Sequence, residues 1–300
     1  MSYRLIALIA LLLGSLSAFG ANLVSGVRMK LAAGDLASGV AAVEDYKHDT
    51  GVDAEYLSAV GWLARGAQML HQPQLADRYV AELHQLIPEE KPDLTGPFGA
   101  AIEVESRLIL EREGRGASLR YLNAALAQAK DPALRARINK NINLLSMEGV
   151  TAPAIDMRDY VGAAPPQGTK GRPVLLFLWA NWCGDCRAQS ASLARVWQRY
   201  RSKGLVLLAP TRYYGTVDEK PATPEEEKAR IAKVWSESYA GLDGVTAPID
   251  NQAHIGYGAS ATPTFVLIDR KGRVRFYTPT RLSEEELSRR IDALLAEPES

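Results

Sequence analysis

A strand pattern that runs directly into two closely spaced cysteines constrains the fold of this chain more than any other feature. The stretch Val174–Arg187 reads VLLFLWANWCGDCR, an apolar run typical of a buried strand followed by Cys183, Cys186 and a helical segment. Two cysteines at the start of a helix can form a reversible disulfide, and the partial positive charge of the helix N-terminus favours a thiolate on the first sulfur. The chain contains no other cysteine, so redox chemistry is the leading hypothesis.

The first 21 residues predict export from the cytoplasm. Arg4 precedes the apolar run Leu5–Leu13, and the small-residue stretch Gly14–Ala21 follows, which is the order found in a signal peptide. A retained membrane anchor is the alternative, because no charged residue follows Arg4 before Arg28. Both interpretations place the remainder of the protein in the periplasm or at the extracytoplasmic face of the membrane.

Residues 27–147 predict an all-α domain built from helical hairpins. Ala, Leu, Arg, Glu and Gln dominate this region, and no alternating β-branched run occurs in it. Asp53 is placed to cap one helix, Pro88 to end another, and Asp131 and Pro132 to open a third. The expected helices cover residues 53–70, 74–87, 100–111, 117–129 and 132–145.

A weak repeat runs through the helical region. Small residues recur at Gly39, Ala76 and Ala117, each at the start of the second helix of an expected pair. This pattern resembles a degenerate tetratricopeptide array, whose repeat is about 34 residues long. A generic helical bundle is the alternative interpretation.

Residues 149–297 predict an α/β domain with a mixed central sheet flanked by helices. Gly149–Pro153 is the expected junction, and strands alternate with helices after it. The expected strands cover residues 174–180, 205–209, 264–269 and 274–277. The expected helices cover residues 186–200 and 224–239, and a last helix is capped at Ser283.

Three motifs of this second region carry a family resemblance. They are the sequence Trp182-Cys183-Gly184-Asp185-Cys186 after a buried strand, Thr262-Pro263 before another strand, and the turn Asp269-Arg270-Lys271-Gly272. Together they resemble the thioredoxin superfamily, and within it the exported TlpA/ResA-like thiol:disulfide oxidoreductases. The resemblance covers about half of the chain and implies an enzyme that exchanges thiols and disulfides with protein substrates.

The resemblance also implies the roles of individual residues. Cys183 would be the exposed nucleophile and Cys186 the resolving thiol, so that their disulfide serves in place of any cofactor. Trp182 would cover the disulfide and contribute to the docking surface. Pro263 would be in the cis form, presenting the backbone of Thr262 to an extended substrate peptide.

The two residues between the cysteines are expected to adjust the reduction potential of the Cys183–Cys186 pair. Gly184 and Asp185 replace the commoner Gly-Pro pair, and the carboxylate of Asp185 counteracts the helix terminus by disfavouring a thiolate on Cys183. We therefore expect a reducing or intermediate couple. Arg212, after the second strand, is a candidate to offset the charge of Asp185.

The proton acceptor that related proteins use for the resolving cysteine is missing. Phe177 stands where thioredoxin has an aspartate, and Gln189 stands where some exported relatives have a glutamate. Asp185 and water remain as candidate acceptors for the thiol proton of Cys186.

The remaining features bear on partners. Lys plus Arg and Asp plus Glu both total 35, which argues against a nucleic-acid partner. Substrates would be protein thiols or disulfides of the cell envelope, with a membrane-bound or soluble thiol as electron donor and a protein partner for the helical domain. The segment Tyr213-Tyr214-Gly215 and the loop Thr216–Thr223 would line a substrate groove or form an ordinary surface loop.

Two other functions remain open. A thioredoxin-fold metal chaperone would bind copper through both thiols and His254. No zinc site is expected, because the four histidines lack the spacing of metal ligands. A helical-repeat interaction protein with an accessory redox domain is the second alternative.

Overall fold

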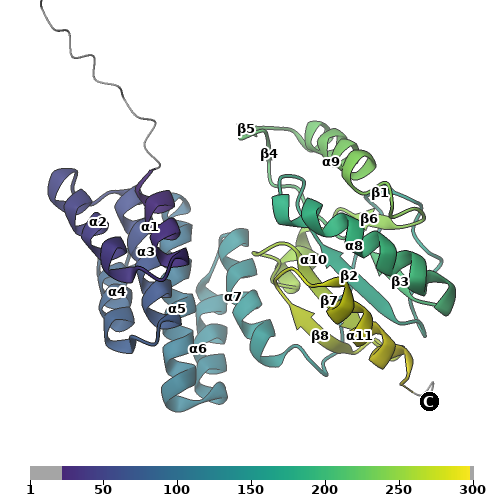
Figure 1. The fold of residues 1–300 in the computed structure, drawn as a ribbon, viewed down its shortest axis with the longest axis horizontal. Coiled ribbons are helices and arrows are strands. Elements are labelled where there is room, and N and C mark those ends of the chain that lie inside the picture. The colour runs from purple at the N-terminus through teal and green to yellow at the C-terminus, as the bar shows by residue number, and fades with distance from the viewer. Residues whose placement is uncertain (1–21, 298–300) are drawn as a thin grey trace, which may run out of the picture.

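The computed structural model describes residues 22–297, with helices in the first half of the chain and an α/β unit in the second half (Figure 1). The predicted signal peptide or anchor at residues 1–21 lies outside the described residues. Within the described part of the chain, no helix is long and apolar enough to cross a membrane.

The first half consists of consecutive helices that pack as neighbours, as the sequence predicts. Asp53 caps α3 by accepting a hydrogen bond from the Tyr56 amide, and Asp131 caps α7 through the amides of Ala133 and Leu134. The α-helices are α1 (Leu23–Ala32), α2 (Leu36–Asp49), α3 (Ala54–Met69), α4 (Pro73–Leu86), α5 (Thr95–Glu113), α6 (Arg115–Gln128) and α7 (Pro132–Ser146).

Helix α5 begins five residues before the predicted start. The short 3-10 turn Pro92–Leu94 leads directly into Thr95, and Pro97 lies within the first turn of α5. Proline is tolerated there because the first amides of a helix have no partner within the helix. The predicted start at residue 100 was therefore too late.

The second half is built on one mixed sheet with the strand order β1-β6-β3-β2-β7-β8. Strand β2 is parallel to β3 and antiparallel to β7. The strands of this sheet are β1 (Tyr160–Gly162), β2 (Val174–Leu178), β3 (Val206–Leu208), β6 (Thr246–Pro248), β7 (Thr264–Ile268) and β8 (Val274–Thr278). The helices of this half are α8 (Gly184–Tyr200), α9 (Pro224–Ser238), α10 (Asn251–Gly256) and α11 (Glu284–Leu295), and a 3-10 turn, Arg201–Lys203, follows α8.

Three features of this half were not predicted. Strands β1 and β6 add to one edge of the sheet, and helix α10 follows β6. The expected loop 216–223 holds a small separate hairpin of β4 (Thr216–Val217) and β5 (Lys220–Pro221). The sheet remains mixed and flanked by helices, so the predicted fold class is confirmed.

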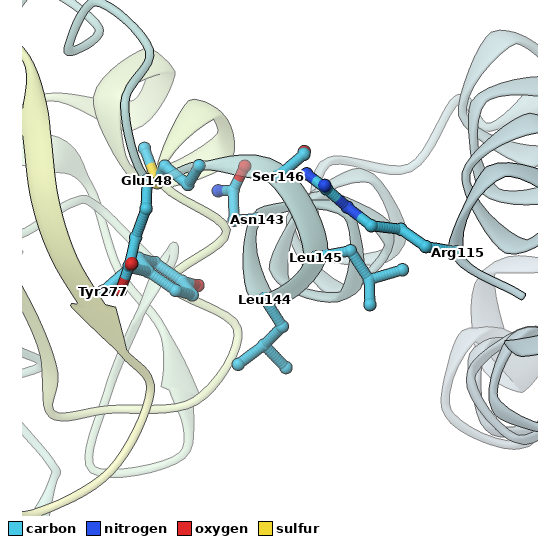
Figure 2. Close-up of a pocket in the computed structure, with 8 residues that line it drawn as sticks. Arg115, Asn143, Leu144, Leu145, Ser146, Glu148 and Tyr277 are labelled. Carbon is cyan, nitrogen blue, oxygen red and sulfur yellow. The ribbon is translucent and has the colours of Figure 1, made fainter.

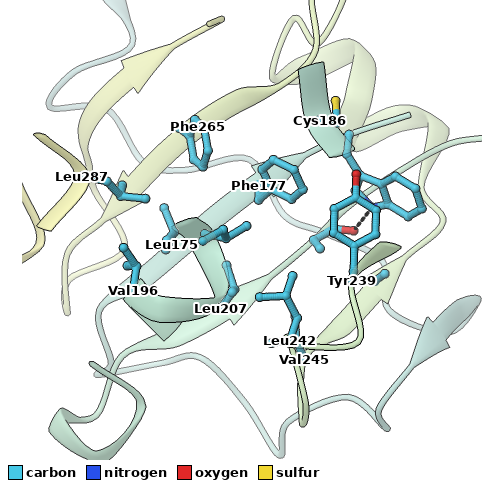
Figure 3. Packing of buried hydrophobic residues seen from close by; sticks show 14 of the residues in the cluster. Leu175, Phe177, Cys186, Val196, Leu207, Tyr239, Leu242, Val245, Phe265 and Leu287 are labelled. Atoms are coloured by element: carbon cyan, nitrogen blue, oxygen red, sulfur yellow. Dashed lines mark hydrogen bonds between the residues drawn. The ribbon is translucent and has the colours of Figure 1, made fainter. Parts of the chain in front are cut away.

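Strand β2 is buried on both faces, which explains its uninterrupted apolar sequence. Leu175 and Phe177 point into a core that Val196 of α8 and Leu287 of α11 complete (Figure 3). Leu176 and Leu178 belong to a second core on the opposite face. With both faces covered, the end of β2 is held firmly where the chain enters the cysteine motif.

Helix α7 joins the two halves through specific contacts. The side-chain amides of Asn139 and Asn143 donate hydrogen bonds to the carbonyls of Ile255 and Gly256, at 2.9 and 3.0 Å. Met147, just after α7, is buried in the second core of the sheet. Figure 2 shows the end of α7 between the two halves, where its residues line a cavity of about 420 Å³ together with Arg115 and Tyr277.

Gly258 allows α7 to pack very closely against the second half of the chain. Its φ is +62°, and a Cβ atom there would overlap the backbone of Asn139 and Lys140 in α7. We predict that Gly258→Ala destabilises the protein by about 3 kcal/mol or more, because it combines an unfavourable backbone conformation with a clash that only movement of α7 relieves.

Gly244→Ala is the matched control, because Gly244 has a φ of +76° and a Cβ atom added to it would meet nothing within 4 Å. This variant should lose only the stability that the unfavourable backbone conformation costs, about 1–2 kcal/mol. Denaturant unfolding followed by circular dichroism compares the two variants. Equal losses of stability would contradict the proposed contact between Gly258 and α7.

Candidate active site

Cys183 and Cys186 form a disulfide at the N-terminus of α8. Cys183 is the N-cap residue, and the Cys186 amide donates a hydrogen bond to the Cys183 sulfur at 3.0 Å. An N–H group and the helix terminus thus both point at this sulfur, and both stabilise negative charge on it when the disulfide opens. The helix begins at Gly184, two residues before the predicted start.

The two sulfurs differ little in exposure. Cys183 retains 4% of its accessible surface and Cys186 retains none. Cys183 is thus the more accessible of the pair, but it is far less exposed than the sequence analysis expected. It lies at the helix N-terminus and against the loop of Thr262.

The Thr262–Pro263 loop lies directly against the disulfide. The peptide bond between these residues is cis, as predicted. The carbonyl oxygen of Thr262 lies 3.4 Å from the Cys183 sulfur. The loop therefore places a backbone carbonyl beside the Cys183 sulfur.

An aromatic group flanks the disulfide on another side. Trp182 is 59% exposed, and its ring meets the edge of Tyr214 with the ring centres 5.5 Å apart. The guanidinium of Arg212 stacks on Tyr214, 4.4 Å from the ring centre. Arg212 thus contacts Tyr214, and the cation that pairs with Asp185 is another arginine.

Arg281 is the cation that contacts Asp185, with 3.5 Å between nitrogen and oxygen. The neighbouring Leu282 is fixed to α8 by Gln189, whose side-chain amide donates to the Leu282 carbonyl at 2.9 Å and accepts from the Leu282 amide at 3.1 Å. Gln189 therefore holds the segment that carries Arg281 beside the cysteine motif.

A buried carboxylate, Glu227 of α9, was missed by the sequence analysis. It is fully buried and accepts hydrogen bonds from the amides of Tyr214 and Gly215, both at 2.8 Å, and from the Asn181 side chain at 3.4 Å. Its position four residues before Ile231 was the available signal, because that spacing places Glu227 on the core face of the helix. Glu227 ties the loop after β3 to the residues just before Cys183.

The β4–β5 hairpin and α9 border a cavity of about 850 Å³ that reaches Trp182. Thr216, Asp218 and Glu219 of the hairpin line one side of it, and Arg230 and Glu237 of α9 line another. Arg230 also forms an ion pair with Asp218 at 3.2 Å. The loop that follows β3 therefore lines a cavity that also includes Trp182, the residue before Cys183.

The hydrogen bond of the His254 side chain is made with the backbone and not with a cysteine. His254 is fully buried, and its Nε2 donates to the Pro210 carbonyl at 3.1 Å. Burial lowers the pKa of His254 to about 4, so its imidazole is neutral at physiological pH. Within residues 22–297, no group of three or more His, Cys, Asp or Glu side chains is arranged to hold a metal ion.

Residues 167–295 match the family of thioredoxin-like domains. The second half of the chain is a thioredoxin-like domain. The chain is similar over 149 residues to the thioredoxin-like protein YneN of Bacillus subtilis (strain 168), at 25% identity, covering 48% of this chain and 79% of that protein. It is also similar over 151 residues to the thiol-disulfide oxidoreductase ResA of Geobacillus thermodenitrificans, at 24% identity, covering 49% and 77%.

A third relative is the thiol:disulfide interchange protein HelX of Rhodobacter capsulatus, at 25% identity over 154 residues, covering 50% of this chain and 78% of that protein. These matches confirm the predicted resemblance to the thioredoxin superfamily and its ResA-like branch. They fall on about half of the chain.

The pair of Asp185 and Arg281 leads to a prediction about the reduction potential. Asp185→Asn removes a negative charge that disfavours the thiolate form and should raise the potential, whereas Arg281→Ala should lower it. Because both side chains are exposed, we expect shifts of about 5–20 mV. Equilibration with glutathione buffers measures each potential.

The double variant and a distant charge serve as controls. Arg281→Ala should have a smaller effect in the Asp185→Asn background, because the pair is then already broken. Arg289→Ala removes the same charge from α11, where Arg289 pairs with Glu286, and should leave the potential unchanged. Equal shifts from Arg281→Ala and Arg289→Ala would rule out a local effect.

Proposed function

We propose that this protein is a thiol:disulfide oxidoreductase that reduces disulfides of protein substrates outside the cytoplasm, with Cys183 as nucleophile and Cys186 as resolving thiol. The observation that carries the proposal is the setting of the Cys183 sulfur. The Cys186 amide lies 3.0 Å from it and the Thr262 carbonyl 3.4 Å from it, so one sulfur meets both a donor that stabilises its thiolate and a backbone acceptor for a substrate.

The reaction follows from thiol–disulfide exchange. The Cys183 thiolate attacks one sulfur of the substrate disulfide, and the other substrate sulfur leaves as a thiolate. The Cys186 thiolate then attacks Cys183 in the mixed disulfide, closing the Cys183–Cys186 bond and releasing the second substrate thiolate. Two electrons pass to the substrate, and the protons lost by the two cysteines pass through solvent to the substrate thiols.

The substrate is proposed to bind as an extended peptide across Thr262 and Trp182. Strand-like pairing with the Thr262 backbone would align the substrate sulfur with Cys183. The exposed ring of Trp182 offers apolar contact beside it. The cavity beyond Trp182, lined by the β4–β5 hairpin, would receive the residues that flank the substrate cysteine.

The reducing direction is supported by the charge next to the reacting sulfur. A couple becomes more oxidising as its thiolate form is stabilised, and Asp185 acts against that stabilisation. Arg281 offsets part of this effect. A thiol partner must return electrons to the Cys183–Cys186 disulfide after each cycle.

A location outside the cytoplasm is supported by the sequence order of Arg4, the apolar run Leu5–Leu13 and the small residues after it. We propose that the helical half tethers the redox domain or binds a protein partner.

Trapping of the mixed disulfide tests the assignment of the two cysteines. In Cys186→Ser the second step cannot occur, so Cys183 should stay covalently attached to envelope proteins and release them on treatment with dithiothreitol. Turnover with insulin should fall to the background rate. Electrophoresis without reductant, followed by mass spectrometry, measures both capture and release.

Cys183→Ser is the control, because it retains a thiol that is completely buried. It should capture far less than Cys186→Ser. Equal capture by the two variants would contradict the assigned order, and failure of the wild type to reduce insulin or glutathione disulfide would contradict the function itself.

A further inference from the structure

The odd-numbered helices of the first half form one layer. Helices α1, α3, α5 and α7 pack side by side in that order, whereas α2, α4 and α6 pack against the odd-numbered helices rather than against one another (Figure 1). A row of helix pairs that packs more closely on one side curves toward that side. Side chains that leave the odd-numbered helices toward solvent therefore line the inner face of the row.

Cations outnumber carboxylates on this layer. Glu103 of α5 forms ion pairs with Lys140 of α7 at 3.0 Å, and with Arg65 of α3 and Arg107 of α5, both at 3.3 Å. Arg137 of α7 interacts electrostatically with the same carboxylate and with Arg65. Four cations and one carboxylate leave this group with a net charge of 4 − 1 = +3.

The single carboxylate is buried, but a cation of the group remains within reach of solvent. Burial would raise the pKa of Glu103, yet the charges of Lys140 and Arg65 outweigh burial and lower it to about 2, so Glu103 is ionised at physiological pH. The side chain of Arg107 is 39% exposed. An anion from solvent can therefore approach the group from the side of Arg107.

The positive charge continues to α1 across an aromatic ring. The guanidiniums of Arg28 and Arg65 lie 4.8 and 5.1 Å from the ring centre of Trp62. Near the end of α5, Glu111 bounds the charged surface and accepts a hydrogen bond from Gln68 at 2.9 Å. The cations of this surface, here called the cationic face, are Arg28, Arg65, Arg107, Arg137 and Lys140.

We infer that the cationic face binds an acidic segment of the protein whose disulfide the redox domain reduces. Its charges are spread over four helices, which suits an extended chain with several carboxylates better than one small anion. Arginine presents paired N–H groups that match a carboxylate, and the half-buried ring of Trp62 adds apolar contact. The inference rests on the proposed function and adds the chemistry of its substrate.

The cationic face lies close to the substrate loop. The backbone of Lys140 packs against Gly258, where an added Cβ atom would be 2.3 Å from the Lys140 amide nitrogen. The chain from Gly258 to Thr262 spans at most about 14 Å, and the Thr262 carbonyl lies 3.4 Å from the Cys183 sulfur. An extended substrate segment of about ten residues is therefore long enough to reach from Cys183 to the cations around Glu103.

Peptide binding to the full chain in its disulfide form tests the inference. A fluorescein-labelled peptide rich in glutamate should bind, and the same peptide with glutamine at each glutamate position should bind at least about tenfold more weakly. Affinity for the acidic peptide should fall as salt concentration rises. Fluorescence anisotropy measures both affinities. Equal affinity for the two peptides, or binding of anionic lipid vesicles but not of the acidic peptide, would overturn the inference.

Two substitutions should change the affinity in opposite directions. Arg107→Gln removes an accessible cation and should weaken binding of the acidic peptide about three- to tenfold. Glu103→Gln removes the carboxylate that competes with the peptide and should strengthen binding by a similar factor. Weaker binding by both folded variants would assign these residues to structure alone and would overturn the inference.

Arg112→Gln is the matched control, because it removes the same charge from α5 at a position where Arg112 pairs with Asp77 of α4. It should leave the affinity unchanged. Circular dichroism checks that each variant is folded. If Glu103→Gln does not fold, the comparison of Arg107→Gln with Arg112→Gln decides, and equal affinities in these two would contradict the inference.

Reduction of peptide disulfides separates this inference from the proposed function. With the wild type and dithiothreitol as electron donor, a disulfide-bonded peptide that carries the glutamate-rich segment should show a KM about tenfold lower than its glutamine counterpart, at similar kcat. Equal KM values would overturn the inference alone. A wild type that reduces neither peptide would instead overturn the proposed function.

Discussion

The antiparallel pairing of β2 with β7 is the constraint on which the rest of the active site depends. Leu178, the last residue of β2, lies opposite Thr264, the first residue of β7. The chain that leaves β2 toward Cys183 and the chain that enters β7 from Pro263 therefore meet at the same edge of the sheet. Both strands are buried on both faces, so neither can slip without exposing a core. The contact between the Cys183 sulfur and the Thr262 carbonyl follows from this register.

The core beneath the disulfide is aromatic at the strand position where the family resemblance implies an acid. Phe177 occupies the strand position of that acid, and the rings of Trp179, Trp235 and Tyr239 pack around it or beside one another. An apolar setting disfavours a thiolate at Cys186. The helix terminus acts on the outer sulfur, that of Cys183, whereas Cys186 is completely buried in this core.

Much of this site could be predicted from local sequence. The strand-turn-helix of the cysteine motif and the Thr262-Pro263 motif each occupy a few consecutive residues, and the resemblance gave their meaning. Strands β1 and β6 were missed because each has three residues, too few to show a period. Arg281 could not be identified as the partner of Asp185, because 96 residues separate them and tertiary contacts with α8, such as the hydrogen bonds of Gln189 and the ion pair of Arg195 with Glu284, bring them together.

The contacts of α7 connect the helical half to the segment that leads into the Thr262–Pro263 loop. Asn139 holds the Ile255 carbonyl, and α7 leaves room at Gly258 for nothing larger than a hydrogen atom. Five residues further along the chain lies Pro263, preceded by the carbonyl that faces the reactive sulfur. A shift of α7 along or away from α10 would therefore displace this short segment, and with it the Thr262 carbonyl that lies 3.4 Å from the Cys183 sulfur.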